Sequence, residues 1–324
     1  MKKIVMLLAV AIIAIAVSSA QAQPVELVIG SGGEGGTYYP VVTEMGEFCN
    51  SDTINVVHYL GPDGKSIGGS EKNKRNLLNN KIMAGIIQND VAQLEKMRND
   101  AMKRLVALIP LHQEQLHFVV PVVAKHTVIV KKFGFLSSQK TVSGANPLAD
   151  VSQLSGKKLA AWGGSVTSAK VVKLMADVGF EIVPTKNRAE AMKLLDSGAV
   201  NVVLSVAGAP VKWLEDLPQG KYKLLTVPSS IVDKLADVYD VANISYDNMG
   251  KTGQAIKALG VDSILFTRTY RTDKMVNALA ELQSCVKKKI YEIQDTPGTH
   301  PVWQTIDPSR SVKWDKVFKK TDSE

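Results

Sequence analysis

The segment Ile29-Gly30-Ser31-Gly32-Gly33-Glu34-Gly35-Gly36-Thr37-Tyr38-Tyr39-Pro40 holds five glycines within twelve residues. It follows the short apolar run Val25–Gly30 and precedes the amphipathic stretch Tyr39–Asn50. A strand, a glycine-rich turn and a helix in that order are typical of the first unit of an α/β fold. The segment therefore predicts an α/β fold whose first strand leads directly into a glycine loop.

Short apolar runs continue to alternate with amphipathic stretches as far as about residue 120, which is the pattern of parallel strands joined by crossover helices. The pattern predicts a first lobe with strands over Val25–Gly30, Ile54–Leu60, Met83–Gln88, Leu105–Ile109 and His117–Val120, and helices over Tyr39–Asn50, Ser70–Asn80 and Val91–Arg98.

A second alternating series begins after Asp150. It predicts strands over Lys158–Trp162, Glu181–Pro184, Val200–Val206 and Lys223–Val227, helices over Ser165–Asp177 and Arg188–Asp196, and then a β-like run over Ser263–Phe266 and a long helix over Asp273–Gln294. The intervening segment Lys125–Ala149 is basic and then rich in Ser, Gly and Asn, which indicates a linker. Two α/β lobes followed by a return of the chain predict a bilobed protein with a ligand cleft between its lobes, although two-domain enzymes share this outline.

The first residues carry the signs of an export signal. Lys2 and Lys3 precede the unbroken apolar run Val5–Val17, and Ala20-Gln21-Ala22 offers a cleavage site with small residues. The run is short for a membrane span, so an uncleaved anchor is the weaker alternative. We expect the signal peptide to be cleaved after about Ala22 and the mature protein to be periplasmic. We expect no later segment to span a membrane. The predicted limits are 1–22 for the signal peptide, 23–120 with a C-terminal return over 241–324 for lobe 1, and 121–240 for the linker and lobe 2.

Composition narrows the class of protein. Of 324 residues, 45% are apolar and 22% are charged, which excludes a disordered chain. The formal charge of +8 is spread in twos and threes without an aromatic-interleaved basic stripe, so no nucleic-acid partner is expected. A basic surface suits an anionic solute, but solvated charged faces explain it equally well.

Cys49 and Cys285 are the only cysteines. In an oxidising compartment such a pair predicts a disulfide, here between the first helix and the long C-terminal helix. Two separately buried thiols are the alternative. Because the chain has no CxxC, HExxH or local Cys/His cluster, we expect no catalytic cysteine, metal site or cofactor.

The glycine loop admits several interpretations. Gly30, Gly32 and Gly35 satisfy the GxGxxG pattern, but a dinucleotide site also needs an acidic residue closing the second strand, which instead ends in Tyr59-Leu60-Gly61-Pro62. No GKS or GKT follows, so a Walker-type phosphate loop is excluded. Two interpretations remain: the backbone N–H groups at the helix start and the Thr37 hydroxyl hold a carboxylate, or the loop is a structural turn.

Three further polar loops occupy equivalent positions. Ser66–Ser70 precedes the second helix, Gln88-Asn89-Asp90 ends a strand, and Gly164–Ser168 begins the first helix of the second lobe. Ser or Thr at a helix start is usually only an N-cap. The carboxyl ends of parallel strands face one crevice, however, so four such loops are expected to converge there.

In their order and spacing these motifs resemble those of the TAXI family of solute receptors of tripartite ATP-independent periplasmic (TRAP) transporters. Ile29–Pro40 is similar to the opening of that family, and Gly68-Gly69-Ser70 with Asn73 to its second helix start. Gln88–Ala92 resembles its Gln-(Asn/Ser)-Asp-x-Ala motif, and Val151–Lys158 the beginning of its second lobe. The likeness covers most of residues 25–206.

The resemblance implies a periplasmic-binding-protein-like fold and a monomeric receptor that captures a small anionic or zwitterionic solute and delivers it to a TRAP permease without chemical change. Solutes of this family include glutamate, glutamine, 2-oxoglutarate and similar carboxylates. The residues expected to line the cleft are Thr37, Tyr38, Gly69, Ser70, Gln88, Asp90, Ser165, Thr167 and Ser168. Asp90 would accept an ammonium group if the solute is an amino acid.

Some positions depart from the family pattern. Leu111-His112-Gln113-Glu114 stands where the family has Leu-Tyr-Pro-Glu, so an aromatic cleft wall is altered and His112 is either cleft-facing or structural. Val166 replaces a glycine of the anion loop Gly-Ser-Gly-Thr. His117 is expected to be an interior histidine, and Trp162 either stacks on the ligand or packs beneath the second lobe.

Two other functions remain open from the sequence. The receptor could feed a membrane sensor protein in place of a permease. A secreted hydrolase is the third possibility, but the chain has no GxSxG or SxxK motif, and nothing in the local sequence places a histidine or lysine beside Ser165. We therefore expect a protein that is not an enzyme.

Overall fold

The computed structural model describes residues 23–131, 137–249 and 254–319. The expected signal peptide, residues 1–22, lies outside the described residues. Within the described part of the chain, no helix is both long enough and apolar enough to cross a membrane.

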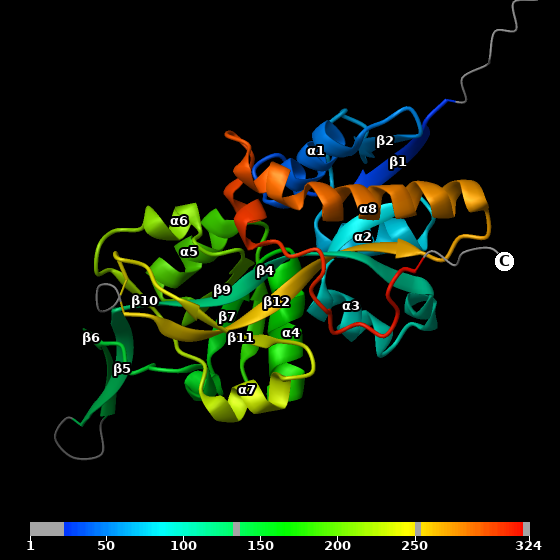
Figure 1. Cartoon of the computed structure of the whole chain (residues 1–324). Helices are drawn as coiled ribbons and strands as arrows, with labels where there is room; N and C mark the ends of the chain where they lie inside the picture. The colour runs from blue at the N-terminus through cyan, green and yellow to red at the C-terminus, as the bar shows by residue number, and fades with distance from the viewer. Residues whose placement is uncertain (1–22, 132–136, 250–253, 320–324) are drawn as a thin grey trace, which may run out of the picture.

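Among the described residues, one sheet of ten strands runs through both lobes (Figure 1). Its main path has the order β2-β1-β3-β12-β4-β9-β7-β8, with β10 paired to β4 and β11 paired to β12. These strands are β1 (Val25–Gly30), β2 (Ile54–His58), β3 (Ala84–Gln88), β4 (Leu105–Pro121), β7 (Lys158–Ala161), β8 (Glu181–Pro184), β9 (Val202–Ala207), β10 (Tyr222–Leu224), β11 (Asp240–Ile244) and β12 (Ile256–Arg268).

In lobe 1, β1 pairs in parallel with β2 and β3, and helices cover both faces of the sheet. Helices α1 (Tyr38–Cys49) and α8 (Asp273–Asp295) share one apolar cluster with β1. Helices α2 (Ser70–Leu78) and α3 (Asn89–Lys96), with the 3-10 turn η1 (Asp100–Arg104), contribute to a second cluster.

In lobe 2, β7 pairs in parallel with β8 and β9, again between two layers of helices. Helices α4 (Gly164–Ala176) and α7 (Ser229–Leu235) contribute to one cluster with the 3-10 turn η2 (Val151–Leu154). Helices α5 (Arg188–Ser197) and α6 (Lys212–Glu215) contribute to the other. The predicted fold class, a two-lobed α/β protein with mainly parallel sheets flanked by helices, is confirmed.

The two lobes share the long antiparallel strands β4 and β12. In β4, Leu108 and Ile109 belong to an apolar cluster of lobe 1, whereas Leu116 and Phe118 belong to one of lobe 2. The prediction of separate strands over Leu105–Ile109 and His117–Val120 was therefore wrong. The polar residues between them suggested a break, but the ladder with β12 continues through Gln113, Glu114 and Gln115.

The segment predicted to be a linker has a different structure. Strand β5 (Val123–Lys131) pairs antiparallel with β6 (Ser137–Ala145), and this hairpin projects from lobe 2 (Figure 1). The chain crosses between the lobes in β4, before the hairpin. On the return, β11 and the first half of β12 still pack in lobe 2, because Ile244 and Ala258 belong to its core. The lobe boundaries thus fall inside β4 and β12 and not at residues 120 and 241.

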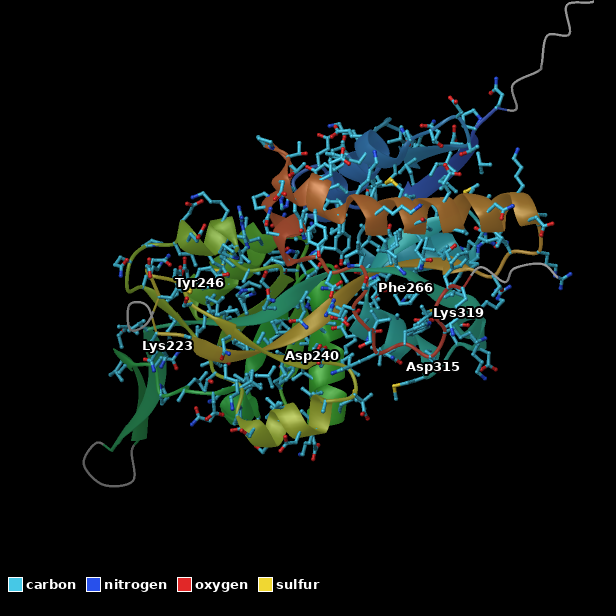
Figure 2. All side chains as sticks on the ribbon, viewed as in Figure 1. Lys223, Asp240, Tyr246, Phe266, Asp315 and Lys319 are labelled. Carbon is cyan, nitrogen blue, oxygen red and sulfur yellow. A yellow bond between two sulfur atoms is a disulfide. The ribbon has the colours of Figure 1, made fainter. Side chains whose placement is uncertain are left out.

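The predicted pairing of Cys49 with Cys285 is present as a disulfide. It joins the end of α1 to α8 across a sequence separation of 236 residues, and sulfur atoms are visible beside α8 in Figure 2. Both helices already pack in one apolar cluster, so the bond connects elements that are in contact. It therefore ties the C-terminal return to the first helix of lobe 1.

Reduction of this disulfide should destabilise the protein by about 2–5 kcal/mol, because the unfolded chain regains the freedom of a very long loop. Urea unfolding with and without reductant measures the difference. The double variant Cys49→Ala/Cys285→Ala is the control, since reductant should leave its unfolding midpoint unchanged. Equal midpoints for the oxidised and reduced wild type would contradict a stabilising role.

Candidate ligand-binding cleft

A cleft of about 1700 Å³ is lined by residues of both lobes. Lobe 1 contributes the glycine loop and the start of α2, and lobe 2 contributes the start of α4 and the segment that follows β9. Gln113, Glu114 and Gln115, in the middle of β4, also line it. The cleft therefore lies directly on the strand that the two lobes share.

Asn73 holds the glycine loop in place. Its Nδ2 donates to the carbonyl oxygens of Gly30, Ser31 and Ile86 at 3.0, 2.7 and 2.8 Å, and so ties the end of β1 to β3. The side chain of Asn73 is fully buried. It is therefore a structural residue and leaves ligand contacts to its neighbours.

The glycines of the two loops serve different purposes. A Cβ on Gly68 would lie 2.1 Å from the carbonyl oxygen of Ser31, so only glycine allows the loops to approach this closely. Gly69 has a φ of +91°, which also favours glycine. At Gly33 and Gly35, in contrast, a Cβ would meet no atom within 4 Å. These two glycines line the cleft and leave their backbone accessible to a ligand.

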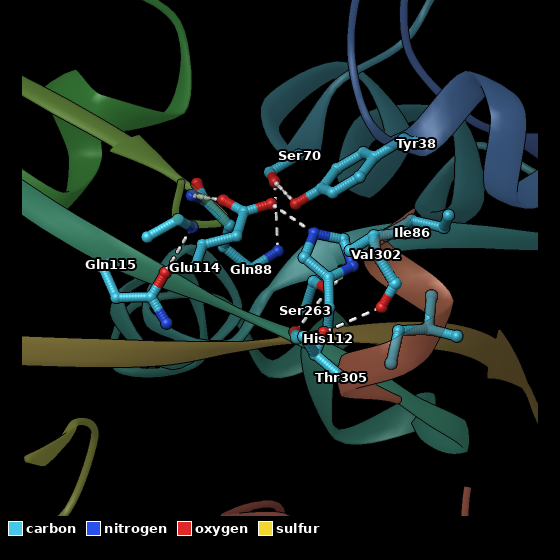
Figure 3. Close-up of polar contacts among 12 residues, drawn as sticks. Tyr38, Ser70, Ile86, Gln88, His112, Glu114, Gln115, Ser263, Val302 and Thr305 are labelled. Atoms are coloured by element: carbon cyan, nitrogen blue, oxygen red, sulfur yellow. Dashed lines mark hydrogen bonds and ion pairs between the residues drawn. The ribbon is translucent and has the colours of Figure 1, made fainter. Parts of the chain in front are cut away.

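A connected polar network forms part of the cleft wall in lobe 1 (Figure 3). Tyr38 Oη lies 3.3 Å from Ser70 Oγ, which accepts the backbone N–H of Gln88 at 3.0 Å. The side-chain Nε2 of Gln88 donates to the carboxylate of Glu114. Burial, followed by the negative charge of Glu114, raises the pKa of Tyr38 well above its usual value, so its phenol stays neutral. Side chains of α1, α2 and β3 are thus linked to one carboxylate on β4.

His112 lies beneath this network and does not line the cleft. It is fully buried, with Nδ1 3.1 Å from Ser263 Oγ and Nε2 3.4 Å from a carboxylate oxygen of Glu114. The order Ser263, His112 and Glu114 resembles a hydrolytic triad, but Ser263 is also fully buried and donates to the carbonyl oxygen of His112. These three residues therefore provide no accessible nucleophile.

Three of the expected site residues lie outside the cleft lining. Asp90 has no exposed surface and accepts the N–H of Val91 and the Oη of Tyr239, both at 2.7 Å. Thr167 donates to Glu71 of the other lobe. Ser168 donates to the carbonyl oxygen of Gly164 at 3.4 Å and also bonds to Asp90. Asp90, Thr167 and Ser168 therefore belong to the contact of lobe 1 with α4. The other expected residues, Thr37, Tyr38, Gly69, Ser70, Gln88 and Ser165, do line the cleft.

The wall from lobe 2 carries an aromatic pair. Trp162 and Trp213 are half-buried and meet edge to face with ring centroids 6.2 Å apart, and the guanidinium of Arg188 lies 5.4 Å from the centre of the Trp213 ring. Trp162 thus faces the cleft while packing against a second tryptophan. Sequence reasoning missed Trp213 and Arg188, because neither belongs to a recognisable motif.

His117, in contrast, is an interior histidine, as expected. Its Nε2 lies 2.9 Å from Tyr246 Oη and its Nδ1 lies 3.3 Å from the carbonyl oxygen of Ser205. Burial lowers its pKa to about 4, so the imidazole is neutral in the folded protein at physiological pH.

Comparison with known proteins shows the family to which this chain belongs. A protein-family profile described as the NMT1-like family matches residues 29–296, which include both lobes. The chain belongs to the NMT1-like family. No curated protein matches the sequence.

Several solved structures are similar to this NMT1-like protein in backbone fold. Tv2483 bound to L-arginine has a TM-score of 0.49 at 13% identity, over 87% of this chain and 92% of that one. The GluR0 ligand-binding core in complex with L-glutamate has a TM-score of 0.47 at 11% identity, over 84% and 96% of the two chains. AbpA, an amino-acid ABC transporter substrate-binding protein of Streptococcus pneumoniae bound to L-arginine, has a TM-score of 0.47 at 10% identity, over 88% and 96%.

The contact between the lobes should make the stability of this NMT1-like protein pH-dependent. Burial raises the pKa of Asp90 to about 6, despite hydrogen bonds from Ser168, Tyr239 and Val91 that oppose the shift. Between pH 4 and 6 the folded protein therefore binds more protons at Asp90 than the unfolded chain does. The contribution of Asp90 to the free energy of unfolding falls as the pH rises through this window, by on the order of 3 kcal/mol.

Asp90→Asn should remove this pH-dependent contribution to the free energy of unfolding, because Asn does not ionise. The variant keeps an acceptor for the Val91 N–H. Urea unfolding at pH 4 and pH 7 should show a smaller loss of stability towards pH 7 in the variant than in the wild type. Asp233→Asn, at an exposed position of α7, is the matched control and should retain the wild-type pH dependence. An unchanged pH dependence in Asp90→Asn would refute the assignment.

Proposed function

We propose that this protein is an extracytoplasmic receptor that captures a small carboxylate-bearing solute, such as an amino acid, a dicarboxylate or a 2-oxo acid, and delivers it to a TRAP-type permease. The observation that carries the proposal is a polar cleft lined by both lobes and built on the strand that the lobes share. Bending within β4 and β12 would bring the walls together around a ligand.

The starts of α1 and α4 support carboxylate binding. In each helix, glycines and a hydroxyl-bearing residue reach the cleft, Thr37 in one lobe and Ser165 in the other. Backbone N–H groups and the helix dipole at such starts favour a negative charge. Ser165 Oγ accepts the N–H of Val206 at 3.0 Å and has its own hydrogen to donate to a ligand.

Delivery to a TRAP permease is supported by the resemblance of Ile29–Pro40, Gly68–Asn73 and Gln88–Ala92 to motifs of TAXI receptors. The match of residues 29–296 to the NMT1-like family is compatible with this assignment. Export is supported by the features of residues 1–22. Purification of the exported protein with and without co-expressed permease subunits would test the partner directly.

A thermal-shift screen of the purified, ligand-stripped protein against amino acids, dicarboxylates and 2-oxo acids should give a selective rise in melting temperature. A ligand that binds only the native state stabilises it by mass action. For such a ligand, Ser165→Ala should weaken binding by about 10- to 100-fold, because it removes a hydrogen bond to a charged carboxylate. Titration calorimetry measures this change.

The exposed Ser230 on α7 provides the control, because Ser230→Ala removes the same hydroxyl outside the cleft and should bind as the wild type does. Wild-type affinity in Ser165→Ala would remove Ser165 from the site. No stabilisation by any compound of the three classes would contradict the proposed class of solute.

A further inference from the structure

We propose that Glu114 is the subsite for a protonated nitrogen of the solute, and that the protein therefore selects a cationic or zwitterionic ligand over a dicarboxylate or a 2-oxo acid. The inference rests on the proposed function as a solute receptor and specifies its substrate class. It assigns to Glu114 the role that the sequence suggested for Asp90.

The burial of Glu114 is the first argument. Its side chain extends from the middle of β4 into the cleft lining and is only 7% exposed. Removing a carboxylate from water is unfavourable unless a positive charge or several hydrogen bonds compensate it. Glu114 has hydrogen bonds with Gln88 Nε2 and Tyr38, but no lysine or arginine lies beside it, so its site would favour a ligand that brings a positive charge.

The charged neighbours of Glu114 provide the second argument. Among the residues that the structure describes, the only basic group within ion-pair distance is His112, whose Nε2 lies 3.4 Å away without hydrogen-bond geometry. No lysine or arginine of the described residues lies within ion-pair distance of Glu114. The carboxylate therefore lacks a permanent positive partner within the protein.

The lysines and arginines that line the cleft are engaged elsewhere. Arg310 pairs with Asp262 at 2.5 Å, Lys212 with Asp216 at 2.5 Å, and Lys221 with Asp196 at 3.1 Å. The fourth, Arg188, lies over the ring of Trp213. In the described lining, none of these groups forms an ion pair with Glu114.

A second acceptor beside Glu114 has no donor. Gln88 is 3% exposed, and its Nε2 donates to Glu114 while its Oε1 has no hydrogen-bond partner. The amide cannot be reversed, because Oε1 would then face the carboxylate. This oxygen lies against Gly164 at the start of α4, where the absent side chain leaves room. A buried acceptor without a donor is unfavourable and points to a missing ligand group.

Together, these groups match the chemistry of an ammonium or guanidinium ion. An ammonium group carries three N–H donors and one positive charge. The carboxylate of Glu114 would supply the negative charge and one or two hydrogen-bond acceptors for this cation. Gln88 Oε1 would supply a further acceptor. A carboxylate of the same solute would then lie at the start of α4, on the facing wall.

Matched pairs of ligands test the proposal without any substitution. Titration calorimetry compares L-glutamate with 2-oxoglutarate and glutarate at one fixed pH. L-Glutamine, L-arginine and agmatine, which keeps the cation but lacks the carboxylate, extend the series. The nitrogen-bearing ligands that bind should do so at least about 30-fold more tightly than their nitrogen-free counterparts, as expected for a buried charge pair.

The variant Glu114→Gln should weaken binding of the nitrogen-bearing ligand by about 30-fold or more. It should leave nitrogen-free ligands unchanged or bound more tightly. Because the change removes a buried charge that no lysine or arginine pairs with, and keeps an acceptor for Gln88 Nε2, the unliganded variant should melt no lower than the wild type. Glu47→Gln, at an exposed position of α1, is the matched control and should bind normally.

The outcomes separate the two proposals. If 2-oxoglutarate or glutarate binds as tightly as L-glutamate, or if Glu114→Gln binds every ligand as the wild type does, the ammonium subsite is wrong and the receptor function stands. If no compound binds the folded wild type, the proposed solute class and the subsite fall together. The ligand comparison uses the wild type alone, so it decides the matter even if Glu114→Gln folds poorly.

Discussion

The antiparallel ladder between β4 and β12 is the constraint on which the rest of the structure depends. It passes through both lobes, and its middle carries polar residues, Gln113 and Glu114 on β4 and Asp262 on β12, where the two apolar cores end. A ladder shift occurs here, between Asp262 and Ile264, at the boundary between the lobes. A shared pair of strands joins the lobes and fixes the residues at their junction.

This arrangement explains why the cleft is polar. In each lobe the carboxyl ends of the parallel strands face the junction, so that the loops before α1, α2 and α4 meet there. Asn73 and the tightly packed Gly68 hold two of these loops together from behind. On the side of α3 and α4, Asp90 and Thr167 link the lobes through one buried and one partly buried hydrogen bond. One side of the junction is therefore closed by protein contacts, and the other is left to a ligand.

Much of this could be predicted from local patterns. Of the expected helix starts, Ser70 and Ser165 lie where the motifs indicated, and the two cysteines are bonded as an even pair in an exported chain would be. The assignment failed where a residue's partners come from distant segments. Asp90 has the sequence context of a cleft residue, yet Tyr239 covers it. In the sequence, Glu114 is only the acidic residue that ends the altered tetrapeptide Leu111–Glu114. Its importance becomes clear once the structure shows that it is buried.

The order of apolar runs, glycine loops and helix starts was sufficient to specify the α/β class, the two lobes and most of the loops at the cleft. These features depend on backbone conformation and on burial patterns that repeat every two residues in strands and every three to four residues in helices. Such patterns can be recognised in the sequence itself. The continuity of β4 and β12, the hairpin of β5 and β6, and the division between ligand-facing and lobe-joining polar residues were decided by tertiary structure. The strand features depend on which segments pair across more than a hundred residues. The role of a polar side chain is known only when its neighbours, its burial and its unpaired atoms are known.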